Sequence, residues 1–332
     1  MSIRQLRRLL VEPDQEAVFR SNDPEDPRLG DLLLSLEDAD EWSGLACVFI
    51  GVPQHIGVER NNGRPGAEQG PRQIRSALTR SATSAIVDAV HSGHLTLIDA
   101  GDIDPEGLTL EQIHDSLHDA VRGLLEMSAF PIILGGGHDT AWPSIRAYET
   151  FGEAYGVINI DAHADVRPLK PESRAHSGSP FRQMLDVEGS VLIPGGFVEF
   201  GLQSHTVAAA HLAYVRDRGM HVEMLDAIRA EGCDVAWHRA LTAAGGSGHL
   251  HVSLDMDGFA SAYAPGVSAP SADGFTPSEI GVCLREAARR PSMTSFDVVE
   301  LNPSYDVDGR TAKLAAAMIM QVLAGLADRH RM

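Results

Sequence analysis

The stretch Tyr155-Gly-Val-Ile-Asn-Ile-Asp-Ala-His-Ala-Asp165 joins an apolar run to polar side chains at alternate positions. Residues 155–160 predict a buried strand, because strands covered on both faces read as continuous apolar runs. Asp161, His163 and Asp165 follow, and an extended backbone turns all three to one side. Parallel strands deliver their carboxyl ends to a ligand-binding crevice, so we expect these side chains to line a site.

Two further segments repeat this arrangement. Residues 135–140 read Gly-Gly-Gly-His-Asp-Thr and residues 253–257 read Ser-Leu-Asp-Met-Asp, so that His138, Asp255 and Asp257 also follow apolar runs. Carboxylates beside imidazoles suit Mn, Fe or Zn, whereas Ca takes oxygen alone. Each motif by itself has a structural or loop interpretation. Together they predict a dinuclear metal site, which can supply hydroxide near neutral pH and therefore indicates a hydrolase.

The rest of the chain alternates short apolar runs with helical patterns from Leu45 onward. This rhythm predicts the α/β class, with one domain of three layers in which helices cover both faces of a mostly parallel sheet. Residues 1–44 are charged and rich in turn formers, and we interpret them as an N-terminal elaboration. Residues 45–332 are then the catalytic domain.

Composition excludes several classes of partner. The chain has 332 residues, 46 acidic and 27 basic, and a formal charge of −19, which argues against nucleic acid. The longest apolar runs fall far short of the roughly 20 residues of a bilayer span, and no signal peptide is evident, so we expect no membrane partner and a cytoplasmic location. Cys47, Cys233 and Cys283 form no CxxC pair and are expected to be buried, reduced thiols.

The three metal-binding segments, in this order, resemble the ureohydrolase superfamily of arginases and agmatinases, over residues 45–326. The resemblance implies an arginase-like sheet of about eight strands, two Mn ions and a homo-oligomer, a trimer or hexamer. It also implies the metal ligands. One ion would be held by His138, Asp161, Asp165 and Asp255, and the other by Asp161, His163, Asp255 and Asp257, with Asp161 and Asp255 as bridges.

A fourth matching segment is Phe296-Asp-Val-Val-Glu-Leu-Asn-Pro303. The resemblance implies that Glu300 binds the cationic amidine or guanidine of the substrate, and a carboxylate can accept paired N–H donors in charge-assisted bonds. An ordinary salt bridge is the alternative for Glu300. Asp297 is expected behind the site, because metal-bound histidines usually need an acceptor on their second nitrogen.

Within the superfamily the chain is most similar to the formimidoylglutamases of histidine degradation. The supporting segments are Gly135-Gly-Gly137, 51–75, 201–203, 263–270 and His176-Ser-Gly-Ser-Pro-Phe181. Arginases and agmatinases carry a histidine where this chain has Ser177. The resemblance implies hydrolysis of N-formimidoyl-L-glutamate to L-glutamate and formamide. The alternatives are an agmatinase, guanidinobutyrase or arginase that releases urea, and an inactive metal-binding homologue.

The remaining site residues are expected as follows. Asp165 would protonate the leaving amine, and His176 is either a proton carrier or a hydrogen-bonding surface residue. Ser177 is a candidate substrate contact. The small-molecule amidine would bring two carboxylates, for which Arg60, Arg64 and Arg182 are the candidates nearest to the motif loops. His114 and His118 are expected to be a surface pair.

Overall fold

The computed structural model describes residues 3–39, 42–246 and 248–329. Its strands form one sheet, in the order β1-β4-β3-β5-β10-β9-β6-β7-β8, with β2 also pairing with β4. All pairs are parallel except β1 with β4. The strands are β1 Leu10–Val11, β2 Leu33–Ser35, β3 Leu45–Gly51, β4 Leu95–Ile103, β5 Phe130–Leu134, β6 Tyr155–Ile160, β7 Leu192–Leu202, β8 His221–Met224, β9 His249–Asp255 and β10 Met293–Val299.

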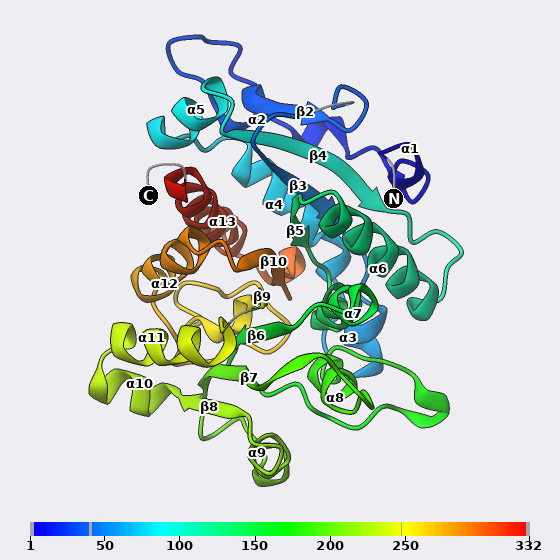
Figure 1. Cartoon of the computed structure of the whole chain (residues 1–332), viewed down its shortest axis with the longest axis vertical. Coiled ribbons are helices and arrows are strands. Elements are labelled where there is room, and N and C mark those ends of the chain that lie inside the picture. The colour runs from blue at the N-terminus through cyan, green and yellow to red at the C-terminus, as the bar shows by residue number, and fades with distance from the viewer. Residues whose placement is uncertain (1–2, 40–41, 247, 330–332) are drawn as a thin grey trace.

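The α/β class and the mostly parallel sheet are confirmed, but the sheet has ten strands where about eight were expected. Strands β3 to β10 account for eight. The other two, β1 and β2, come from residues 1–44 and extend the sheet beyond β3 along β4 (Figure 1). They are two and three residues long, too short to leave a readable alternation in the sequence.

Helices cover both faces of the sheet, which confirms the three layers (Figure 1). One apolar cluster packs α4, α5 and α10 to α13 against one face, and a second packs α6 to α9 against the other. Alternate residues of β3 divide between the two clusters, as the two-residue period of a strand requires. The helices are α1 Ile3–Leu6, α2 Leu29–Leu32, α3 Ile56–Arg60, α4 Gly70–Leu78, α5 Ser84–His91, α6 Leu110–Glu126, α7 Ala141–Phe151, α8 Pro180–Leu185, α9 Ala209–Arg216, α10 Leu225–Glu231, α11 Cys233–Ala244, α12 Pro277–Arg289 and α13 Arg310–Asp328.

Helix α13 is the one described helix that is long and apolar enough, by length and composition, to cross a bilayer. The search for long apolar runs in the sequence did not identify it. Its most apolar window is 78% buried inside the protein. It packs against α12 and α4, and Arg285 and Arg289 of α12 pair with Asp328 at its end. Its apolar character is therefore that of a core helix.

Four neighbouring strands at the centre of the sheet place the predicted site. β5, β10, β9 and β6 lie side by side and run parallel. The segments that follow them begin at Gly135, Glu300, Met256 and Asp161 respectively, so all four polar segments leave the same edge of the sheet. Parallel pairing is what brings segments from distant parts of the sequence to one crevice.

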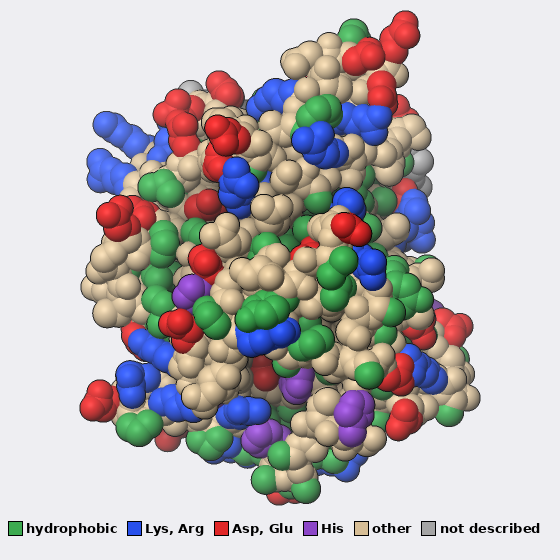
Figure 2. Space-filling model, turned by 180° about the vertical axis from the view of Figure 1, so that it is seen from behind, with side chains coloured by type: hydrophobic (Ala, Val, Ile, Leu, Met, Phe, Trp, Pro, Cys, Tyr) green, Lys and Arg blue, Asp and Glu red, His purple; other side chains and the backbone are tan. Residues whose placement is uncertain are grey.

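Charged side chains of both signs share one face of the molecule. Figure 2 shows acidic and basic side chains interspersed over one face, without a continuous basic stripe on that face.

Candidate active site

The six expected metal ligands come together at this edge of the sheet, in two groups. In the first group the Nδ1 atom of His138 lies 3.1 Å from Asp165 Oδ2, 3.1 Å from Asp255 Oδ2 and 3.3 Å from Asp161 Oδ2. The imidazole is fully buried. Three carboxylates thus face a single nitrogen, which is the arrangement of a metal site.

The second group shares Asp161 with the first. His163 Nδ1 lies 3.1 Å from Asp257 Oδ2 and 3.5 Å from the second oxygen of Asp161. Asp161 thus offers one oxygen to each group, as a bridging carboxylate does. Asp255 belongs to the first group only, and its other oxygen accepts the backbone N–H of Asp257 at 2.7 Å.

The residues fit a pair of divalent ions. His138 Nδ1 and Asp257 Oδ1 are buried without a hydrogen-bond partner, although buried polar atoms are rarely left unpaired. Burial, with the charges of Asp257 and Asp161, raises the pKa of Asp255 well above its usual range. A cation among these carboxylates removes that repulsion and uses both unpaired atoms as ligands.

Close packing around the loop before His138 leaves little room for side chains at its glycines. A Cβ at Gly136 would lie 1.9 Å from the Gln54 carbonyl oxygen. A Cβ at Gly137 would lie 2.7 Å from a methyl carbon of Val58. Any larger residue would push this loop away from the segment that follows β3 and carry His138 out of the site.

A chain of buried hydrogen bonds lies behind His138. Its Nε2 atom is 3.0 Å from Ser253 Oγ, and the Ser253 hydroxyl donates to Asp297 at 2.6 Å. Asp297 also bonds His251 at 3.0 Å. Because Asp297 accepts the serine proton, Ser253 must accept from Nε2, and Nδ1 is left with its lone pair toward the carboxylates. The acceptor expected behind the metal-bound histidine is therefore Ser253, supported by Asp297.

Glu300 lies directly beside the metal ligands. One of its carboxylate oxygens accepts the backbone N–H of His138 at 2.8 Å, and its own N–H donates to the Gly136 carbonyl at 2.8 Å. Burial raises the pKa of Glu300 to about 8. Glu300 and Asp165 have positive φ angles of 64° and 43°, which non-glycine residues seldom adopt. Such backbone strain is typical of functional sites, where surrounding contacts hold it in place.

A cavity of about 240 Å³ opens onto this cluster. Ser177 lines it, and the Ser177 hydroxyl accepts a hydrogen bond from the Asn61 amide at 3.1 Å. The side chains that line the cavity are mostly polar: Asn61, Asn62, Arg64, His163, Asp165, Arg167, Ser177, Asp255, Asp257, Ser268 and Glu300. A small, highly polar ligand fits such a lining.

His176 lies outside the cavity lining, and both of its ring nitrogens bond to the backbone. Nε2 donates to the Pro168 carbonyl at 3.0 Å and Nδ1 accepts the Gly178 N–H at 3.2 Å. Burial lowers the pKa of His176, which favours the neutral ring that these bonds require. The expectation of a proton carrier at this position has no support in this geometry, because the one-residue displacement from Ser177 turns the ring away from the site.

The three arginines expected to receive substrate carboxylates are also placed differently. Arg60 pairs with Glu111, and Arg182 pairs with Asp186, and neither lines the cavity. Arg64 does line it, but its guanidinium donates to the backbone carbonyls of residues 267 and 268 and stacks 3.8 Å over the Tyr305 ring. These three arginines are close to motif loops in the sequence, but that proximity did not predict the positions of their guanidinium groups.

Two residues near the site were not predicted from the sequence to lie there. Arg167 lines the cavity, and the signal for it was its position two residues after Asp165 in the same segment. His114 was expected at the surface and this was wrong: it is buried and bonds Asp139 at 2.7 Å. Its partner lies 25 residues away in the sequence, so only the packing of α6 against the loop after β5 reveals the pair.

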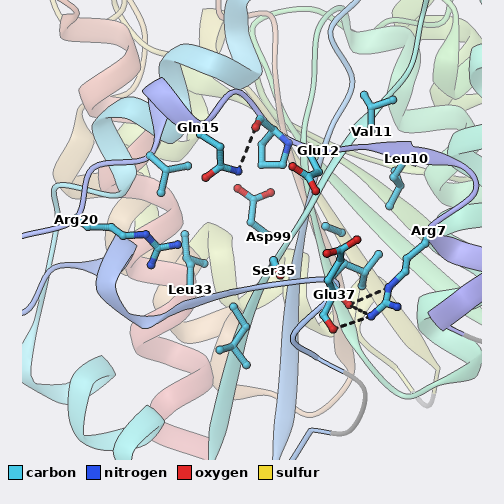
Figure 3. Close-up of a pocket in the computed structure, with 15 residues that line it drawn as sticks. Arg7, Leu10, Val11, Glu12, Gln15, Arg20, Leu33, Ser35, Glu37 and Asp99 are labelled. Carbon is cyan, nitrogen blue, oxygen red and sulfur yellow. Dashed lines mark hydrogen bonds between the residues drawn. The ribbon is translucent and has the colours of Figure 1, made fainter. Parts of the chain in front are cut away.

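A second cavity, of about 250 Å³, lies between residues 7–37 and β4. In the order of the strands, β4 is separated by β3 from the four strands that carry the ligand segments and Glu300. Figure 3 shows Arg7 and Arg20 at opposite ends of it and Asp99 between them. Arg7 and Arg20 donate to backbone carbonyls, and Asp99 is held by Arg75. No metal-binding group of described residues lies there, whereas Asp165, Asp255, His163 and Asp257 of the two groups line the first cavity.

Comparison with known proteins agrees with this geometry. The sequence model of the arginase family matches residues 45–325. A formimidoylglutamase of Geobacillus thermodenitrificans is 34% identical over 281 residues, 84% of each chain, and one of Rhodococcus opacus is 35% identical over 292 residues, 84% of this chain and 85% of its own. The solved structure of Trypanosoma cruzi formiminoglutamase with two Mn²⁺ ions is 37% identical, with a TM-score of 0.82, and covers 92% of this chain and 99% of its own.

Proposed function

This chain belongs to the arginase family, and from that premise we propose that it is a binuclear manganese hydrolase that cleaves N-formimidoyl-L-glutamate to L-glutamate and formamide. The observation that carries the proposal is the cluster of six ligands around Asp161, with the buried Glu300 beside it at the floor of a polar cavity. We assign His138, Asp161, Asp165 and Asp255 to one ion, and Asp161, His163 and Asp257 to the other.

The ions, when bound, would lower the pKa of a water molecule and so provide a nucleophile near neutral pH. Glu300 would accept N–H donors of the formimidoyl cation with the oxygen that does not bond His138, and would orient its carbon toward the nucleophile. A buried carboxylate with a raised pKa becomes ionised when a cation arrives beside it, so substrate binding and the charge of Glu300 support each other.

Asp165 is the proposed proton carrier. It faces the first metal group and also lines the cavity, so its carboxylate would reach both the attacking water and a substrate in the cavity. It would accept the proton that the attacking water loses and deliver it to the nitrogen of the leaving glutamate. The C–N bond then breaks, and formamide and L-glutamate leave with all atoms of the substrate and the water accounted for.

Product analysis tests the proposal. Mn-loaded enzyme is incubated with N-formimidoyl-L-glutamate, agmatine, 4-guanidinobutyrate and L-arginine, and formamide, urea and ammonia are measured. We expect formamide and L-glutamate from the first compound only. Urea from any guanidine, without formamide from N-formimidoyl-L-glutamate, would reverse the assignment in favour of a guanidine hydrolase. No product from any compound would favour an inactive homologue, although all six ligands and Glu300 are present.

Three further features belong to this proposal. We propose that residues 45–332 form the catalytic domain and residues 1–44 an elaboration of it, in agreement with a family match that begins at residue 45. We propose that the enzyme works in the cytoplasm. We also propose a homo-oligomer, a trimer or hexamer, which light scattering coupled to size exclusion would test directly.

A further inference from the structure

The proposed substrate carries two carboxylates into a cavity whose floor already holds Asp165, Asp255, Asp257 and Glu300. Like charges in a small volume repel, so the cavity must offer a cation for the end of the substrate that is distant from the metal ions. Among the residues lining the cavity, two are arginines, Arg64 and Arg167.

These two arginines differ in how their guanidinium groups are used. Arg64 is part-buried, donates to two backbone carbonyls and stacks on Tyr305, so it fixes the loop at residues 267 and 268. Arg167 is exposed, and among the described residues it has no carboxylate partner. Its one side-chain hydrogen bond goes to the Asn61 amide oxygen at 3.2 Å. A guanidinium has five N–H donors, so most of those of Arg167 remain for a ligand.

The stem of Arg167 is held against the segment that carries Ser177. The Arg167 backbone N–H donates to the Gly178 carbonyl at 2.8 Å. A Cβ at Gly178 would lie 2.9 Å from Arg167 Cδ and 2.8 Å from Asn61 Nδ2, so only glycine lets both side chains pack there. Asn61 accepts from Arg167 with its oxygen and donates to the Ser177 hydroxyl with its nitrogen, which leaves the Ser177 proton available to a ligand.

We propose, resting on the function proposed above, that Arg167 binds a carboxylate of the substrate at the mouth of the cavity, with Ser177 as a second donor positioned by Asn61. The planar guanidinium donates two parallel N–H bonds to one carboxylate. Arg167 therefore selects acidic amidines, and it repels substrates whose far end is an ammonium group, such as agmatine.

The test is the variant Arg167→Gln, with Arg167→Lys as its conservative partner. We expect Arg167→Gln to raise KM for N-formimidoyl-L-glutamate by about 10- to 100-fold, the usual worth of a charge-assisted bond, and Arg167→Lys to raise it less. Neither variant should change the rate with formamidine, which has no carboxylate. Gly178→Ala should raise KM for N-formimidoyl-L-glutamate in the same direction, because it displaces Arg167 and Asn61 together.

The matched control is Arg174→Gln, an exposed arginine of the same loop that does not line the cavity. Arg174→Gln should leave the KM for N-formimidoyl-L-glutamate and the rate with formamidine unchanged. In every Arg167 variant, Mn content and Tm should equal those of the unaltered enzyme. A KM for N-formimidoyl-L-glutamate that stays within about twofold in Arg167→Gln, or an equal loss with formamidine, would overturn the inference.

Failure of the proposed function is a separate outcome. If the unaltered enzyme releases urea from guanidines and no formamide, Arg167→Gln is compared on 4-guanidinobutyrate and agmatine, which differ in the charge of the far end. The inference then requires that Arg167→Gln raise the KM for 4-guanidinobutyrate and leave the KM for agmatine unchanged or lower it. Equal effects on both would overturn it.

Discussion

Asp161 is the residue on which the two metal groups depend, because it offers one oxygen to each. We therefore expect Asp161→Asn to lose both Mn ions and nearly all turnover. Asp165 belongs to the first group alone, so Asp165→Asn should keep one ion in the group of His163. Metal analysis of the purified variants, as Mn per chain, checks this. Two ions retained in Asp161→Asn would contradict the shared carboxylate.

Ser253 is a second residue with a specific expected effect. It accepts from His138 and donates to Asp297, so it fixes the tautomer that leaves Nδ1 free for metal. Ser253→Ala should lower Mn affinity by about 10- to 100-fold, as loss of a partner behind a ligand usually does. Ser295→Ala is the control, since Ser295 bonds His251 further along the same network and does not touch His138. Equal Mn affinity in Ser253→Ala and the unaltered enzyme would remove Ser253 from this role.

The raised pKa values of the site predict how the stability of the metal-free protein depends on pH. Burial raises the pKa of Asp257 to about 6 and that of Glu300 to about 8, both above the ordinary values near 4. The carboxylate of Asp257 raises the pKa of His163 above its usual range. These groups bind more protons in the folded protein than in the unfolded chain, so the stability that they contribute is lost as pH rises from about 4 through about 8.

Thermal unfolding with and without Mn checks this prediction. The metal-free protein should have a lower Tm at pH 8 than at pH 5.5, whereas bound cations keep the carboxylates ionised and should abolish or reverse that trend. A metal-free Tm that rises between these pH values would contradict the electrostatics described for the site.

At the scale of single elements, helices α11 and α12 contact each other through a pair of cysteines. Cys233 Sγ lies 3.7 Å from Cys283 Sγ, and Cys233 is partly exposed. The expectation of a buried thiol is confirmed for Cys47 and Cys283 and is wrong for Cys233, and nothing in the sequence indicated that two of the three cysteines are neighbours. The two cysteines are 50 positions apart in the sequence, and the segment between them includes β9, with the ligand Asp255 at its end and Asp257 just beyond.

We expect oxidised glutathione to convert Cys233 and Cys283 to a disulfide while the disulfide reagent is reduced to two thiols. Closing a loop of this length should stabilise the fold by about 4 kcal/mol if the helices accept the bond without strain. Thiol titration of the denatured protein and a Tm measurement check this, with Cys283→Ser as the control that cannot form the bond. Three titratable thiols after oxidation would contradict it, and Cys47, fully buried, should stay reduced in either case.

At the scale of the whole molecule, the described part of residues 1–44 covers one region of the sheet. β1 and β2 pair with β4, and Leu6, Leu33 and Leu36 of this segment are buried against the core of the protein. Deleting residues 1–44 should lower Tm and promote association, because it exposes strand edges and apolar side chains. Mn content per folded chain should not change, since none of the described residues of this segment belongs to a ligand group. Loss of metal together with unchanged Tm would contradict this division.

Local patterns in the sequence were sufficient to predict the class of the fold and the six side chains that meet at the candidate site. Strands buried on both faces leave apolar runs, and the ligands of the site follow these runs within a few residues, as His138, Asp161 and Asp255 do. The short strands β1 and β2 left no such pattern.

Only the tertiary structure decided where long side chains end and which distant residues meet. Arg60, Arg64 and Arg182 stand near motif loops in the sequence, but salt bridges and backbone carbonyls occupy them, and Arg167 is the arginine that lines the cavity without such a partner. The physical reason is the length and flexibility of the arginine side chain. A strand fixes the direction of the side chains on it, whereas the position of a guanidinium at the end of a flexible chain depends on partners that other elements supply.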